Sequence, residues 1–84
     1  MNYQEMRKEL LDIISEVTNQ DNLEHLDDAR ALKEQLEMDS MDLLDYVMEL
    51  KRKFQIDIKE TDFTKLGTIH DSIDFLSANR SLNP

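Results

Sequence analysis

Apolar residues recur every three or four positions in three separate stretches of the chain. This spacing places them on one face of a helix, so it predicts three amphipathic helices rather than strands. The stripes are Met6, Leu10, Ile13, Ile14 and Val17 in the first stretch, Leu43, Val47, Leu50 and Phe54 in the second, and Ile69, Ile73 and Leu76 in the third. We expect the first helix to cover residues 3–17, and the core to form where the three stripes meet.

Residues that favour helix starts stand before each stripe. Asn, Asp and Thr side chains accept hydrogen bonds from the backbone of the first turn, and an acidic residue three positions later suits the positive helix end. The pairs are Asn2 with Glu5, Asp39 with Asp42, and Thr68 with Asp71. Residues 60–66 predict a short helix that turns Phe63 and Leu66 inward, followed by Gly67 in a left-handed conformation. Residues 79–84 are expected to fray.

A long connection, residues 18–39, separates the first two predicted helices. Such a connection in a small domain is usually functional or packed by its own side chains. Four leucines can fix it to the core, namely Leu23, Leu26, Leu32 and Leu36. Residues 29–36 are expected to form a helical turn or two. The predicted fold is all-α and occupies a single domain, residues 1–84. It is a small bundle of three main helices and one short helix, with a long loop between the first and second helices.

Nineteen acidic and ten basic residues give the chain a net charge of −9. A polyanion repels nucleic acid and anionic lipid and attracts basic protein surfaces, so we expect protein partners and no nucleic acid. The alternative is a solvated acidic surface with no binding role. No apolar run approaches the roughly 20 residues that span a bilayer. The lack of cysteine and of a secretory signal fits a cytoplasmic location, and we expect a monomer.

Ser40 lies in the acidic stretch LEMDSMD, residues 36–42, without a neighbour that could activate it. No histidine or lysine is close in sequence, and the glycine elbow of a serine hydrolase is absent. His25 and His70 do not have the spacing of zinc ligands. These observations predict no catalytic residue and no metal site. On them alone, Ser40 is a serine of the kind often found at helix starts.

Two further stripes follow Ser40 along the second helix. One is apolar and the other acidic, and they consist of Met41, Leu44 and Met48 and of Asp42, Asp45 and Glu49. The apolar stripe is either a second buried face or an exposed surface that adapts to partners, as methionine does. The acidic stripe is either a solvated helix face or a means of steering a basic partner. The residues alone leave both alternatives open.

Three segments together resemble the acyl carrier protein family: LKEQL at 32–36, LEMDSMDLLDYVMELKRKFQIDI at 36–58 and TIHDSIDFLSANR at 68–80. The resemblance implies that Ser40 is esterified to 4′-phosphopantetheine, donated from coenzyme A by a phosphopantetheinyl transferase. Asp39 would cap the helix and contribute to recognition by that transferase. The arm supplies the thiol that the chain lacks, and it would carry acyl groups as thioesters between acyl-transferring and condensing enzymes. The two stripes after Ser40 would then be the docking face.

The sequence departs from the family pattern at three places. The family usually has glycine where Glu37 stands and leucine where Met41 stands, and its second helix usually stays acidic where this chain has Lys51, Arg52 and Lys53. These basic residues would disfavour the basic docking patches of general fatty-acid synthesis enzymes. We therefore expect a specialised fatty-acid or polyketide-type pathway. In a carrier we also expect the bundle to open to admit an acyl chain, so that a loaded chain raises the melting temperature. The alternative is a helical interaction module that is never modified.

Overall fold

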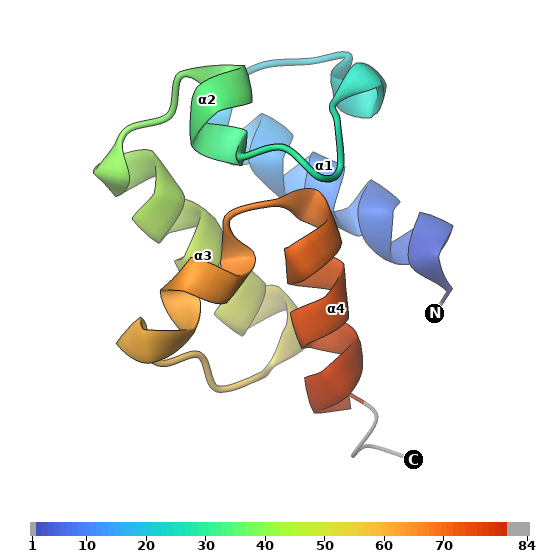
Figure 1. Cartoon of the computed structure of the whole chain (residues 1–84), viewed down its shortest axis with the longest axis vertical. Helices are drawn as coiled ribbons and strands as arrows, with labels where there is room; N and C mark the ends of the chain where they lie inside the picture. Colours follow the sequence, from blue (N-terminus) through green and yellow to red (C-terminus); the bar gives the residue numbers. More distant parts are fainter. Residues whose placement is uncertain (1, 81–84) are drawn as a thin grey trace.

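The computed structural model describes residues 2–80, and every regular element within this range is helical. Three main helices form the bundle, and three shorter segments connect them (Figure 1). The main helices are α1 (Tyr3–Thr18), α3 (Ser40–Phe54) and α4 (Ile69–Arg80). The shorter segments are η1 (Leu23–His25), α2 (Leu32–Leu36) and η2 (Glu60–Leu66). This arrangement confirms the predicted all-α bundle, and η1 is an addition that the sequence pattern did not predict.

The predicted caps are present at all three main helices. The Asn2 side chain accepts a hydrogen bond from the backbone N–H of Glu5 at 2.9 Å, and the Glu5 carboxylate accepts one from the N–H of Asn2 at 3.1 Å. The Thr68 hydroxyl accepts a hydrogen bond from the N–H of Asp71 at 3.0 Å, at the start of α4. These bonds satisfy backbone donors that have no partner within the helix, so they fix where each helix begins.

The long connection runs over one end of the bundle, at the top of the view in Figure 1. All four of its leucines are buried, as predicted: Leu23, Leu26, Leu32 and Leu36. Backbone hydrogen bonds of 2.9 Å join Leu32 to Gly67 and His70 to Asp28, so the connection is also tied to the chain just before and within α4. Arg7 on α1 forms an ion pair of 2.8 Å with Asp28. The connection is therefore a packed part of the fold.

The core lies where α1 packs against both α3 and α4. On α3 the fully buried residues are Tyr46, Val47 and Leu50. The predicted stripe included Val47 and Leu50, but its outer members, Leu43 and Phe54, are only partly buried. The prediction passed over Tyr46 because its hydroxyl makes tyrosine a residue of intermediate burial preference. The buried face of α3 is thus rotated toward Tyr46.

The left-handed conformation predicted for Gly67 is wrong, since its φ is −76° and its ψ is −15°. The 3-10 segment η2 leads directly to the cap of α4, so the chain needs no left-handed residue there. Positive φ angles occur instead at four other residues, Asn19, Asn22, Glu37 and Gln55. Helix α4 continues to Arg80, so residues 79 and 80 are helical, and residues 81–84 of the expected frayed segment lie outside the described residues. Within the described part of the chain, none of the helices could cross a membrane.

Candidate functional site

Ser40 is the first residue of α3, and its side chain is exposed to solvent. The cap in front of it is formed by Asp39 and Asp42. The Asp39 carboxylate accepts a hydrogen bond from the N–H of Asp42 at 2.9 Å, and the Asp42 carboxylate accepts one from the N–H of Asp39 at 3.3 Å. Asp39 is therefore the predicted cap, and with Asp42 it forms a capping box, so the Ser40 hydroxyl is not needed to start the helix. It is therefore available for another role.

The chain before Ser40 is fixed to the core and to α2. The Met38 side chain is buried, and its backbone N–H donates a hydrogen bond of 3.1 Å to the Lys33 carbonyl. Glu37, directly before Met38, ends α2 in the left-handed conformation, with φ of 52° and ψ of 42°. A buried residue two positions before Ser40 and a sharp turn just before it fix the direction in which α3 begins. The exposed serine thus stands on a rigid base.

The start of α3 can accommodate a phosphodiester on Ser40. The first N–H groups of an α-helix have no intrahelical acceptor, and the helix dipole is positive at this end. The Asp42 N–H is used by the cap, but those of Ser40 and Met41 lie in the same turn, and both side chains are exposed. No hydrogen bond joins the Ser40 hydroxyl to another described residue. The residues present therefore fit a phosphopantetheine group at this position.

The apolar stripe beside the core stripe is exposed. Met41, Leu44 and Met48 have exposed fractions of 67%, 41% and 54%. The alternative of a second buried face is therefore wrong, and α3 presents three large apolar side chains to solvent directly after Ser40. A group of exposed apolar residues at helical spacing is typical of a surface that binds a partner.

The three acids beside this stripe are not equivalent. Asp45 is exposed, whereas Asp42 is part of the helix cap and Glu49 pairs with Arg52 at 2.5 Å. The hydrogen bond from Arg52 lowers the pKa of Glu49 below its usual value. Asp45 is thus the acid of this stripe with the most accessible negative charge.

The predicted basic cluster at the end of α3 consists of Lys51, Arg52 and Lys53, and most of it forms ion pairs within the chain. Lys53 forms an ion pair of 2.8 Å with Glu9 on α1, and this hydrogen bond raises the pKa of Lys53. Arg52 pairs with Glu49, as described above. Lys51 has no ion pair with another described residue. The predicted cluster therefore consists of two paired charges and one lysine without an ionic partner in the described part of the chain.

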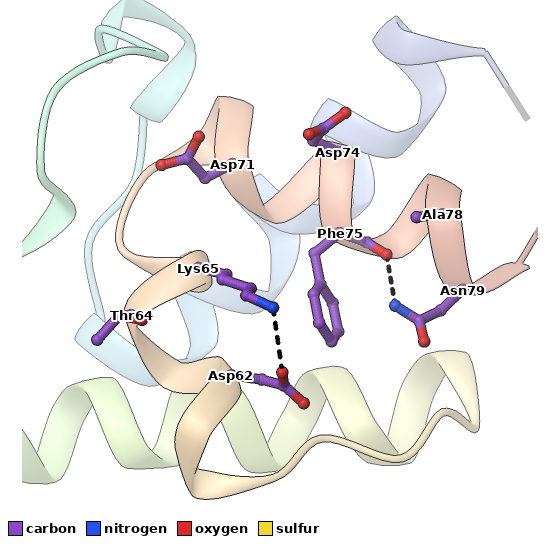
Figure 2. A pocket seen from close by; sticks show the side chains of 8 residues that line it. All are labelled: Asp62, Thr64, Lys65, Asp71, Asp74, Phe75, Ala78 and Asn79. Carbon is purple, nitrogen blue, oxygen red and sulfur yellow. Dashed lines mark hydrogen bonds and ion pairs between the residues drawn. The ribbon is translucent and has the colours of Figure 1, made fainter.

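A groove of about 600 Å³ lies between η2 and α4 (Figure 2), and none of its lining residues belongs to α3. The Phe75 side chain projects into it, and Lys65 reaches toward Asp62 at 3.7 Å. Most of its lining residues are polar or charged, Asp71 and Asp74 among them, and Phe75 and Ala78 are the apolar ones. The sequence patterns did not predict this groove, and none of the predicted site residues lines it. Among the described residues, no group of three or more His, Asp or Glu side chains is placed to hold a metal ion.

Known proteins share both the sequence pattern and this geometry. Residues 8–76 match the family described as "Phosphopantetheine attachment site". An acyl carrier protein of Buchnera aphidicola subsp. Schizaphis graminum is 32% identical over 72 residues, which cover 86% of this chain and 90% of that one. One of Rubrobacter xylanophilus is 32% identical over 74 residues, covering 83% and 90%.

A solved structure shows the same fold. The acyl carrier protein from Enterococcus faecalis superimposes with a TM-score of 0.76 at 25% identity, covering 94% of this chain and 99% of that one. The family match and both relatives extend over most of the chain, which includes Ser40 and the whole of α3. The chain therefore belongs to the acyl carrier protein family, whose members are carriers rather than enzymes and bear a 4′-phosphopantetheine group.

Proposed function

We propose that Ser40 is the residue to which 4′-phosphopantetheine is attached, and that the arm holds acyl intermediates as thioesters. The observation that carries this assignment is the exposed Ser40 hydroxyl at the first position of α3, which the capping box of Asp39 and Asp42 leaves free. Ser40 needs no base of its own, because the transferase that modifies it supplies the activation. The chain contains no cysteine, so the thiol that carries the cargo comes from the arm.

Asp39 and Asp42 have a supporting role in this proposal. Their reciprocal hydrogen bonds hold the first turn of α3 in place before the transferase arrives. A preformed turn lowers the ordering cost of binding, so the transferase can recognise a rigid surface. Asp39 is exposed, and we infer that the transferase contacts it directly.

The docking face consists of Met41, Leu44 and Met48 with Asp42, Asp45 and Glu49, and it receives the transferase and the enzymes that transfer or condense acyl groups. The exposure of its three apolar residues supports this role. An apolar strip beside acids suits a partner with an apolar contact surrounded by basic residues. The same face would serve successive partners, because methionine side chains adapt to different surfaces.

We also infer that the pathway is a specialised one of fatty-acid or polyketide type, and that the protein acts as a monomer in the cytoplasm. The basic residues at the end of α3 support the first inference, although the ion pairs of Arg52 and Lys53 leave mainly Lys51 to repel a basic partner. An unmodified interaction module, the alternative from the sequence, would present the same docking face but would never gain the arm.

Replacing Ser40 tests the proposal directly. We expect the intact mass of the wild type to rise by one phosphopantetheine after incubation with a phosphopantetheinyl transferase and coenzyme A, and Ser40→Ala to show no rise. Stability should change by no more than about 1 kcal/mol, because Asp39 supplies the cap. The matched control is Ser77→Ala, since Ser77 is also an exposed helical serine. Modification of Ser40→Ala, or no modification of the wild type, would contradict the assignment.

A further inference from the structure

Two hydroxyl groups meet in the interior of the bundle. The Tyr46 hydroxyl on α3 donates a hydrogen bond of 2.8 Å to the Ser72 hydroxyl oxygen on α4. The Ser72 hydroxyl donates in turn to the Leu66 carbonyl oxygen at the end of η2, at 3.2 Å. Both side chains have an exposed fraction of 0%. This chain of hydrogen bonds therefore connects α3, η2 and α4 through the centre of the fold.

Apolar side chains enclose this polar pair. Tyr46 is among the largest side chains that are completely buried. The other fully buried residues of α3, η2 and α4 are Val47, Leu50, Leu66, Ile69 and Leu76. No buried side-chain nitrogen or oxygen among the described residues lacks a hydrogen-bond partner. The interior between α3 and α4 is thus filled by the Tyr46 ring, and its polar groups are satisfied.

An alkyl chain on the arm of Ser40 could escape water on the exposed strip of Met41, Leu44 and Met48, along the groove that Phe75 lines, or in the interior between the helices. To enter the interior, the chain would have to displace the Tyr46 ring and separate its hydroxyl from Ser72. Burying a hydroxyl without a partner is unfavourable, so a displaced Tyr46 hydroxyl would have to find another acceptor or reach water.

We propose that the hydrogen-bonded Tyr46–Ser72 pair closes the interior of this carrier to alkyl chains, so that its cargo is a short acyl group that stays outside the bundle. This inference rests on the proposed carrier function and makes it more specific. It also revises the sequence-based expectation that a loaded chain stabilises the bundle by entering it.

The test compares thermal unfolding of the acetyl and octanoyl forms of the modified protein. For the wild type we expect equal melting temperatures, because neither chain enters the core. In Tyr46→Leu the smaller apolar side chain opens space, and Ser72 keeps its hydrogen bond to Leu66. We expect its octanoyl form to melt about 4 °C or more above its acetyl form. Ile14→Ala, a truncation of a fully buried residue on α1, is the control and should behave like the wild type.

Each outcome decides the proposal. An octanoyl wild type that melts about 4 °C or more above the acetyl form overturns it, because the chain then enters despite the pair. No difference in Tyr46→Leu also overturns it, because the pair would not be what excludes the chain. If Tyr46→Leu does not fold, Tyr46→Phe removes only the hydroxyl and should show a smaller rise with chain length. A flat result for Tyr46→Phe in that case counts against the pair.

Failure of the proposed function is separately visible. Intact mass shows whether Ser40 is modified before any chain is compared. If it is not, Ser40→Cys provides a unique thiol in a chain that has no cysteine, and a maleimide bearing the same acyl arm can be attached there. The comparison of melting temperatures is then made on that conjugate, and the same outcomes apply.

Discussion

At the scale of single residues, Glu37 adopts an unfavourable backbone conformation, and the turn that it forms fixes the position of Ser40. It ends α2 with φ of 52° and ψ of 42°, and its side chain is exposed. For a residue with a Cβ atom this left-handed conformation costs about 1–2 kcal/mol. The glycine that the family usually has at this position would avoid most of that cost. The departure noted in the sequence thus corresponds to a strained backbone position.

We predict that Glu37→Gly raises the free energy of unfolding by about 0.5–1 kcal/mol, since relief of the strain exceeds the added entropy of a glycine in the unfolded chain. Urea denaturation measures the change. Glu37→Ala is the control, because it removes the carboxylate but keeps the Cβ atom and should bring no comparable gain. Equal stabilities of the two variants would show that the backbone angle is not the source of the effect.

The burial of Tyr46 should also make the stability of the protein depend on pH in the alkaline range. Burial raises the pKa of Tyr46, while burial and the hydrogen bond to Asp28 raise the pKa of Tyr3 to about 12. An unfolded tyrosine titrates near 10, so the stabilising contribution is fully present below about pH 10 and is lost as the pH rises toward the folded pKa. In urea titrations between about pH 8 and 12, stability should fall above pH 10. The fall should be less steep in Tyr46→Phe, and an equally steep fall would contradict the role of Tyr46.

At the scale of secondary-structure elements, the sequence predicts the helices that have a repeating apolar face and a recognisable cap. The three main helices repeat an apolar face over several turns, and their starts carry recognisable side chains such as Asp39 and Thr68. The short segment η1 has too few residues to show a period. The conformations of Glu37 and Gly67 depend on how neighbouring elements join, which local sequence does not determine. The burial of Tyr46 and Ser72 was not predicted, because a hydroxyl is favourable in the core only when it has a hydrogen-bond partner. The sequence does not show that these two hydroxyls pair with each other.

The difference between the predicted and observed faces of α3 can be measured. Leu50 is fully buried, whereas Phe54 is partly exposed at the end of the helix. We predict that Leu50→Ala costs about 2–5 kcal/mol of stability and that Phe54→Ala costs less than the usual value for a buried phenylalanine, about 3–5 kcal/mol. Thermal or urea unfolding of both variants gives the comparison. A larger loss for Phe54→Ala would restore the face predicted from the sequence.

At the scale of the whole molecule, the net charge is −9, but the acidic residues behind it are not equally accessible to a partner. Some acids are engaged within the fold, as Glu9 is with Lys53 and Asp28 with Arg7, so they contribute less to the field that a partner meets. Asp45 is exposed beside the apolar strip, and Asp74 is exposed on α4 among the residues that line the groove. The residues of the docking face remain a prediction from the sequence, and only the ion pairs distinguish Asp45 from Glu49.

These two exposed aspartates allow a matched test of the docking face. Asp45→Lys and Asp74→Lys change the net charge equally, so long-range attraction to a basic transferase falls to a similar extent in both. Only Asp45→Lys also places a cation beside the exposed apolar strip of α3, where it would repel the basic residues of the bound partner. We expect Asp45→Lys to slow phosphopantetheine transfer on the order of tenfold more than Asp74→Lys at low salt. The difference should shrink at about 1 M salt, where the Debye length is about 3 Å. Equal rates for the two variants at low salt would place the docking surface elsewhere on the molecule.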